Sequence, residues 1–204
     1  MIDPTPTTLR RFVDALRNKL ARADSVPLPE LTMQQRAAAV LVPLIYRGGG
    51  LRIIYTRRSD RLTSHRGQVA FPGGRLDRHD PDLLGAALRE TFEEVGIEPR
   101  QVEVLGSFEG RATRQEQIFV TPFVGFVHEP IELRPDPKEV AEIFEVPLPI
   151  LSDQRYRGVH RANTDGIATA HPAILYEGQT IWGLTYYLTL RFLELSRHVD
   201  VVPD

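Results

Sequence analysis

The segment Gly73–Ile97 constrains the fold of this 204-residue chain more than any other part of the sequence. A Gly-Gly turn leads into a helical pattern, and Gly96 follows that pattern as a helix stop. The helix carries one basic and three acidic residues close together: Arg89, Glu90, Glu93 and Glu94. With about 3.6 residues per turn, the three glutamates share one side of the helix, where like charges repel one another. Such a helix needs either counter-charges or a bound cation on that side.

The glutamates offer hard oxygen ligands, which suit Mg²⁺ or Mn²⁺ better than zinc. Glu90 and Glu94 lie four residues apart, so we expect both to bind a metal directly, with Glu93 contributing through a second ion or a bridging water. A backbone carbonyl of the turn, such as that of Gly74, is a further candidate ligand, because glycine lets the backbone approach closely. Arg89 is expected to organise the site by holding Glu93. Taken alone, the same pattern also fits a solvated helix face.

The context of these residues resembles the Nudix box, in which a glycine precedes an Arg-Glu-x-x-Glu-Glu-x-Gly helix. The matching residues are Gly74, Arg89, Glu90, Glu93, Glu94, Gly96 and Ile97. The chain departs from the usual pattern in three ways. Gly74 and Arg89 are one residue further apart, the first glutamate of the box has no clear equivalent, and Thr91 replaces an aliphatic residue. Asp80 is the nearest candidate for the missing acid, and Asp77 is another.

Residues 53–74, IIYTRRSDRLTSHRGQVAFPGG, resemble the signature that precedes the box in the coenzyme A pyrophosphatase branch of the Nudix family. That branch also carries the extra residue before Arg-Glu, and the resemblance covers about residues 38–190. It implies metal-dependent hydrolysis of coenzyme A or its thioesters to 3′,5′-ADP and a 4′-phosphopantetheine product. Two alternatives stay open. One is hydrolysis of other nucleoside-diphosphate derivatives, such as ADP-ribose, NADH or diadenosine polyphosphates, and the other is a ligand-binding regulator without catalytic activity.

Beside such a site, the basic stretch 57–66 is interpreted as a phosphate clamp, although a solvated basic loop is the alternative. Arginine offers planar, bidentate donors that suit phosphate, so Arg58 and Arg66 are the first candidates for phosphate contacts, with Arg61 beside them. We expect His65 either to hydrogen-bond the diphosphate or to hold the loop. A general base that takes the proton of the attacking water has three candidates: Glu93, Glu139 and Glu142.

Composition excludes several functional classes. The chain has 25 basic and 27 acidic residues and a net charge of -2, so nothing favours binding to nucleic acid or to an anionic membrane. Cysteine is absent, which excludes disulfides and thiol catalysis and fits a reducing compartment. No apolar run approaches the roughly 18–20 residues that span a bilayer. We therefore expect a cytoplasmic enzyme with a small-molecule substrate, either a monomer or a homodimer.

Strands and helices without strict βαβ alternation predict an α+β or mixed α/β fold. The resemblance implies a Nudix-type α/β/α sandwich around a mixed β-sheet, formed by residues 31–204 after an N-terminal helical arm and linker at residues 1–30. The expected helices cover residues 7–23, 80–95 and 182–196, and the expected strands lie within residues 37–46, 51–56, 102–110, 116–128 and 155–178.

Several finer expectations concern individual residues and short segments. Asp80 is expected to cap the second helix, with Pro81 at its first position. Pro122 is expected to weaken its strand or to mark a sheet edge. A short helix or turn is expected at residues 137–145, and an extended or looped segment at residues 146–151.

Overall fold

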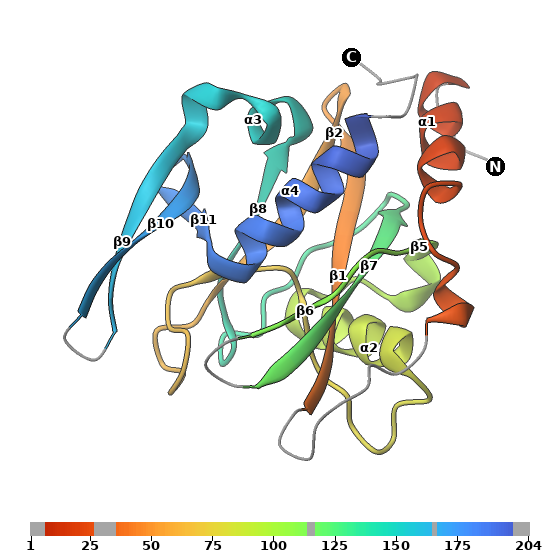
Figure 1. The fold of residues 1–204 in the computed structure, drawn as a ribbon. Helices are drawn as coiled ribbons and strands as arrows, with labels where there is room; N and C mark the ends of the chain where they lie inside the picture. Colours follow the sequence, from red (N-terminus) through yellow and green to blue (C-terminus); the bar gives the residue numbers. More distant parts are fainter. Residues whose placement is uncertain (1–6, 27–35, 114–116, 165–166, 198–204) are drawn as a thin grey trace.

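The computed structural model describes residues 7–26, 36–113, 117–164 and 167–197 (Figure 1). The predicted boundary between residues 30 and 31 lies outside these ranges. The helices are α1 (Thr7–Arg17), α2 (Leu83–Val95), α3 (Leu148–Ser152) and α4 (Gly183–Arg197). The strands of the main sheet are β1 (Arg36–Arg47), β2 (Gly50–Arg58), β3 (Val69–Ala70), β4 (Gly73–Arg75), β5 (Val102–Ser107), β6 (Arg111–Ala112), β7 (Ile118–Val127) and β8 (Val140–Pro147). A second sheet contains β9 (Arg157–Thr164), β10 (Ile167–Tyr176) and β11 (Gln179–Trp182).

The main sheet is mixed, which confirms the predicted fold class. β1 runs parallel to β7, with Leu41 opposite Phe123, whereas the other strand pairs of this sheet are antiparallel. β2 lies between β1 and β8, and β7 lies between β1 and β5. The second sheet is an antiparallel meander whose β9–β10 hairpin extends away from the main sheet (Figure 1).

A short insertion separates β1 from β2 over part of their length. The two strands pair only near their turn, from Leu44↔Ile53 to Arg47↔Gly50. Beyond that point β3 pairs with β2 and β4 pairs with β1, so residues 69–75 complete the sheet between them. The strand β4 that contains the Gly-Gly turn is therefore hydrogen-bonded into the sheet.

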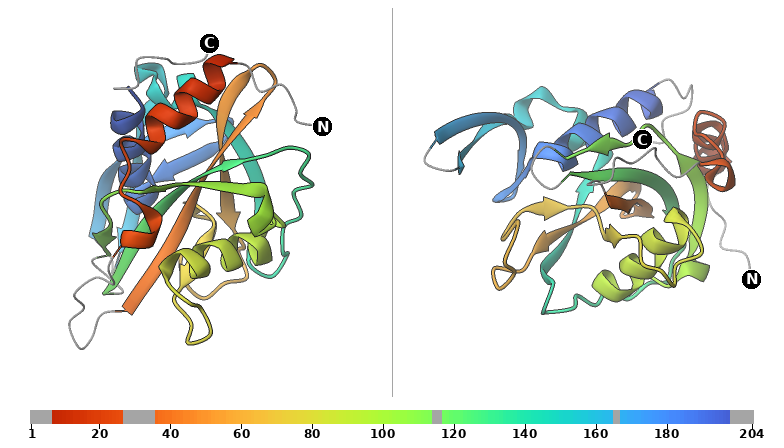
Figure 2. Two further views of the ribbon diagram at one scale, coloured as in Figure 1. Left: turned by 90° about the vertical axis from the view of Figure 1, so that its right-hand side faces the viewer. Right: turned by 60° about the horizontal axis from the view of Figure 1, so that its bottom comes forward.

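Alternating side chains of β1 separate two hydrophobic layers, as expected for a strand buried on both faces. Ala39 and Leu41 pack with α2, and Val42 and Leu44 belong to the core that includes residues of α1 and α4. The sheet thus lies between α2 on one face and α1 and α4 on the other (Figure 2). No helix among the described residues has the length and apolarity needed to cross a membrane.

Most of the expected helices and strands are confirmed, with α1 ending earlier than expected. Two segment predictions were confirmed only in part. Residues 137–139 form the expected turn, but strand β8 begins at Val140, because it pairs with the outer edge of β2. Residues 146–147 are extended as expected, but helix α3 begins at Leu148, since a proline in the first turn of a helix loses no hydrogen bond.

Pro122 pairs with Val40 of β1 on one side, whereas its other side faces the break between β5 and β6, where its carbonyl accepts from Phe108 N–H. The expected weakening of the strand thus matches a break in the strand pairing, although β7 as a whole lies between β1 and β5. The expected cap of α2 was wrong. The cap of α2 is Asp82, whose carboxylate accepts from Gly85 N–H at 2.7 Å, and the helix begins after the expected Asp80 and Pro81.

Candidate metal centre

Helix α2 presents its glutamates toward the inserted strand β4. Asp82 fixes the start of the helix, and Gly96 ends it in the left-handed conformation with φ of 80°. Thr91, at the position where an aliphatic residue was expected, is buried and donates its hydroxyl to Ala87 O at 2.7 Å. Its polar group is satisfied within the helix, so the substitution leaves the packing intact.

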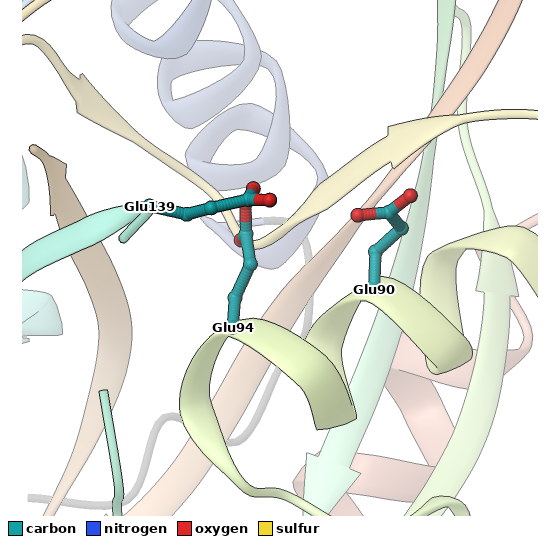
Figure 3. A group of neighbouring side chains, drawn as sticks. All are labelled: Glu90, Glu94 and Glu139. Carbon is teal, nitrogen blue, oxygen red and sulfur yellow. The ribbon is translucent and has the colours of Figure 1, made fainter. Parts of the chain in front are cut away.

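Three carboxylates meet beside β4. Glu90 and Glu94 project from successive turns of α2, and Glu139 reaches them from the turn immediately before β8 (Figure 3). One oxygen of each carboxylate lies within 4.8 Å of the others. Glu94 is buried, Glu90 is half-buried and Glu139 is exposed. The group therefore has an inner end at Glu94 and an outer end at Glu139 that opens to solvent.

The two glycines of β4 shape this group in different ways. Gly73 N–H donates to Glu94 Oε2 at 3.2 Å. Gly74 leaves room for Glu90, because a Cβ atom there would lie 2.4 Å from the Glu90 carboxyl carbon. Gly73 itself has φ of 146°, and a Cβ atom there would lie 2.3 Å from the backbone oxygen of Ala39. Both positions thus require glycine, one for the backbone and one for the carboxylate.

Burial leaves the acidic group short of positive charge. Burial raises the pKa of Glu94 to about 8, against a smaller lowering by Gly73 N–H and by the charge of Arg58. Burial also raises the pKa of Glu90, although Arg89 opposes the shift. Three carboxylate oxygens at this separation match the ligands that Mg²⁺ and Mn²⁺ prefer, and a divalent ion would supply the missing charge. The residues present therefore fit a hard divalent cation.

Arg89 links this group to its surroundings through all of its guanidinium nitrogens. Nε and Nη2 donate to the two carboxylate oxygens of Asp80 at 2.8 and 3.0 Å. Nη1 donates to Glu90 at 2.9 Å and to Glu93 at 3.0 Å. The expected pairing with Glu93 is present, but that carboxylate is about half exposed and stands outside the group of three. Asp80 is the partner that helical spacing could not reveal, since it lies in the loop before α2.

The other candidate bases occupy different surroundings. Glu142 pairs with Arg57 at 3.4 Å and accepts from Gln179 Nε2 at 2.9 Å, away from the carboxylate group. Glu139 lies in the group, and its backbone oxygen accepts from Ser59 N–H at 2.8 Å. The structure thus separates two acids that lie close together in the sequence.

The candidate phosphate-binding residues lie at the end of β2 and in the loop that follows it. Arg58 ends β2, and its buried Nε has no hydrogen-bond partner within the described part of the chain. The charge of Arg58 acts on the Glu94 carboxyl, so this guanidinium lies near the inner end of the group. His65 bonds Gln68 through Nδ1 at 3.0 Å, and Arg61 and Arg66 are exposed in the same loop.

A cavity of about 390 Å³ lies beside Glu90. Its lining consists of Arg75, Leu76, Asp77, His79, Arg89 and Glu90. The cavity gives space for an extended ligand next to a carboxylate of the group.

Comparisons with known proteins found similar sequences and similar folds. The family model described as NUDIX domain matches residues 35–163. A Yersinia pestis protein named "Uncharacterized Nudix hydrolase NudL" is 40% identical over 182 residues, which cover 87% of this chain and 89% of that protein. The chain also resembles a Nudix hydrolase from M. smegmatis, RenU, with a TM-score of 0.56 and 19% identity, over 83% of this chain and 91% of that one. A MutT/nudix family protein from Enterococcus faecalis is similar with a TM-score of 0.54 and 18% identity, over 88% of this chain and 69% of that one. At these identities the solved structures bear on the fold alone.

Proposed function

The chain belongs to the Nudix hydrolase family, and on this premise we propose that it cleaves the diphosphate of coenzyme A or of its thioesters. The products are 3′,5′-ADP and 4′-phosphopantetheine or its acylated form. The observation that carries the proposal is the carboxylate group of Glu90, Glu94 and Glu139, next to Arg58 at the end of β2. Arg58 belongs to the 53–74 signature that resembles the coenzyme A pyrophosphatase branch.

Glu90 and Glu94 are the proposed ligands of Mg²⁺ or Mn²⁺. Such an ion, when bound, lowers the pKa of a coordinated water and neutralises charge on phosphate oxygens. The chain itself contributes the orientation of these carboxylates. Gly73 N–H holds Glu94, and Gly74 leaves the space that Glu90 occupies. Glu93, whose carboxylate is held by Arg89, is available only for a more distant contact.

Glu139 is the proposed general base. It comes from a different element than the helix, it is exposed, and its carboxylate lies close to those of Glu90 and Glu94. It would take a proton from a water molecule while that water attacks one phosphorus of the diphosphate. The bond from that phosphorus to the bridging oxygen breaks, and the bridging oxygen leaves with the second phosphate. Two phosphate monoesters result, and the abstracted proton passes from Glu139 to solvent.

The basic residues are proposed to bind the substrate. Arg58 has an unused, buried Nε–H, so it can turn a donor toward a phosphate oxygen near Glu94. Arg61, His65 and Arg66 lie in the loop that follows, and they are candidates for the remaining phosphates. Coenzyme A carries a ribose 3′-phosphate besides its diphosphate, so it requires more cationic partners than a simple dinucleotide does.

A substrate panel tests the proposal. Purified protein with Mg²⁺ or Mn²⁺ is incubated with coenzyme A, acetyl coenzyme A, ADP-ribose, NADH and a diadenosine polyphosphate, and kcat/KM is measured for each. We expect the highest value for coenzyme A or its thioester. Higher kcat/KM for any other compound would replace the coenzyme A assignment with the broader alternative. No hydrolysis of any diphosphate by protein that binds Mn²⁺ would favour a ligand-binding regulator.

A further inference from the structure

We propose that an aromatic cluster on the second sheet binds the purine base of the substrate, an inference that rests on the proposed cleavage of coenzyme A. The aromatic cluster consists of His160 on β9, His171 on β10 and Trp182 at the end of β11. Trp182 is the only tryptophan of the chain. The ligand of the cluster is the adenine ring in the 3′,5′-ADP half of coenzyme A.

The indole of Trp182 reaches across the sheet. It is stacked on the ring of His160, with ring centroids 4.2 Å apart and an angle of 28° between the planes. The strand β10 runs between β11 and β9 and places Ala173, which is fully buried, opposite Trp182. The indole therefore passes over a small side chain to contact β9. The ring of His171 lies 5.3 Å from the indole, so three rings gather on one face of the sheet.

This face differs from the other face of the same sheet. The three rings of the aromatic cluster are only partly buried, whereas Ile174 and Ile181 on the opposite face belong to the main core. His171 shares a hydrogen bond with Thr169 at 2.9 Å. Within the described part of the chain, the ring nitrogens of His160 and the indole N–H make no hydrogen bond. An aromatic surface with free polar groups at its edge matches a purine, which stacks through its face and hydrogen-bonds through its nitrogens.

The aromatic cluster is linked to the carboxylate group by a short series of contacts. Thr185, three residues after Trp182, donates its hydroxyl to the backbone oxygen of Val69 in β3 at 2.9 Å. From β3 the chain continues through residues 71–72 into β4, where Gly73 N–H donates to Glu94. A base at the aromatic cluster and a diphosphate at the carboxylate group can therefore belong to one ligand.

The basic loop at residues 59–68 leads to the same part of the fold. It ends at β3, and β11 lies against β3. The loop carries Arg61, His65 and Arg66, the candidates for phosphate contacts. A nucleotide bisphosphate complements this charge, and its base can then stack on Trp182. The 4′-phosphopantetheine half of coenzyme A has no aromatic ring, so the aromatic cluster favours the nucleotide half.

The fluorescence of the only tryptophan reports on this cluster directly. The full-length protein with Mg²⁺ is titrated with 3′,5′-ADP and, separately, with 4′-phosphopantetheine, and the emission of Trp182 is recorded. Neither compound contains a diphosphate bond, so neither is hydrolysed. We expect saturable quenching by 3′,5′-ADP, because the base stacks on the indole, and no saturable change with 4′-phosphopantetheine.

Substitutions separate binding of the base from catalysis. Trp182→Leu should raise KM for coenzyme A by about 10-fold, the size typical of one base stacked on an aromatic side chain. Its kcat should change by less than about twofold, since the base lies away from the reacting phosphorus. Trp182→Phe keeps a ring and should raise KM less. The matched control is Tyr176→Leu, which removes a ring of the same sheet that contacts Tyr156 and should leave both constants unchanged.

Two results would overturn the inference. One is hydrolysis of coenzyme A by protein whose Trp182 emission does not respond to 3′,5′-ADP. The other is a folded Trp182→Leu protein whose KM lies within about twofold of the Tyr176→Leu control. If Trp182→Leu does not fold, His160→Ala is measured under the same criterion, because it removes the stacked ring and keeps the indole. Saturable quenching by 3′,5′-ADP in protein that hydrolyses no coenzyme A would contradict the proposed function and support the base-binding site.

Discussion

At the scale of single residues, the ionised carboxylate of Glu94 destabilises the folded state of the metal-free protein. Because burial raises its pKa in the folded state to about 8 from a usual 4.5, the folded state holds a proton that the unfolded state has released over this range. Stability is therefore greatest below about pH 4.5 with respect to this group and falls as pH rises through 8. Glu90, whose pKa is also raised, adds to the same trend.

Replacement of Glu94 by glutamine should make the metal-free protein more stable at pH 8. We expect the free energy of unfolding in EDTA to rise on the order of 2–4 kcal/mol over wild type at pH 8, with the difference shrinking toward pH 5. Urea unfolding at several pH values measures this. The variant should lose catalysis by orders of magnitude at the same time. A difference that does not depend on pH would show that Glu94 is not protonated in the folded state.

Glu139 and Glu142 provide a matched pair of acids. Glu139→Gln should lower kcat by about 10²-fold or more while Mn²⁺ binding changes little, because a base acts on the proton and not on the ion. Glu142→Gln should leave kcat near wild type, since its carboxylate bonds to Arg57 and Gln179. Steady-state kinetics and Mn²⁺ titration of both variants check this. A large loss of Mn²⁺ affinity in Glu139→Gln would make Glu139 a ligand instead of the base.

The two glycines of β4 predict opposite kinds of damage. Gly73→Ala places a Cβ atom against the backbone of Ala39 and strains a φ of 146°, so we expect a loss of stability of several kcal/mol. Gly74→Ala meets only the flexible end of Glu90, so the protein should stay folded but bind Mn²⁺ at least several-fold more weakly. Thermal unfolding and Mn²⁺ titration separate the two. Equal stability of the two variants would contradict this account.

At the scale of elements, α1 is part of the main hydrophobic core. Leu9, Phe12, Val13 and Leu16 are buried in the cluster that includes residues of β2 and α4. Glu103 of β5 pairs with Arg10 and Arg17 of the helix, and the same carboxylate bonds His128 at 3.0 Å. Burial alone would raise the pKa of Glu103, but these partners lower it, so the contribution of this carboxylate to stability is present at neutral pH and lost in acid.

Phe12→Ala should therefore lower the stability of the whole domain and not only detach α1 from it. Removal of a fully buried phenylalanine typically costs about 3–5 kcal/mol. The exposed neighbour Arg11 offers a control, because Arg11→Ala should change the free energy of unfolding by less than about 0.5 kcal/mol. Denaturant unfolding followed by tryptophan fluorescence measures both. Similar midpoints for the two variants would mean that α1 is not needed by the domain.

Local patterns predicted the elements well where spacing within one element decides the outcome. The strands β1 and β2 were predicted at residues 37–46 and 51–56, and α2 followed from its helical pattern and from Gly96. The strand β8 was not predicted, because its conformation depends on pairing with β2, which is far away in the sequence. Pro122 left two alternatives open for the same reason, since the break between β5 and β6 opposite this residue is not visible in the sequence.

At the scale of the whole molecule, metal binding should stabilise all of the domain. The carboxylate group joins α2, β4 and the turn before β8, so an ion that binds there and not to the unfolded chain stabilises the folded state. We expect saturating Mg²⁺ to raise the melting temperature by several degrees at pH 8 and less at pH 5.5, where protons compete for the carboxylates. Thermal denaturation with Mg²⁺ or EDTA tests this. An equal shift in Glu94→Gln would place the ion elsewhere.

The candidate site was only partly predictable, because its residues come from distant parts of the chain. The helix spacing placed Glu90 and Glu94 on one side of α2. The same reasoning left Glu139 and Glu142 equivalent, since only the register of β8 against β2 separates them. The pairing of Asp80 with Arg89 could not be predicted from helix spacing, because it depends on the loop geometry that the bonds between Asp80 and the backbone of Asp77 set. The choice between Glu139 and Glu142, and the partner of Arg89, thus depend on contacts between residues that are distant in the sequence.

The insertion of residues 69–75 between β1 and β2 also bears on how such a chain can change its substrate during evolution. The glycines that shape the acidic group lie in β4, which pairs with β1, so a substitution there damages either the fold, at Gly73, or the acidic group, at Gly74. The basic loop at residues 59–68 carries no strand and can vary at little energetic expense. A change of substrate would then arise through substitutions in this loop, while α2 and β4 keep the carboxylate group unchanged.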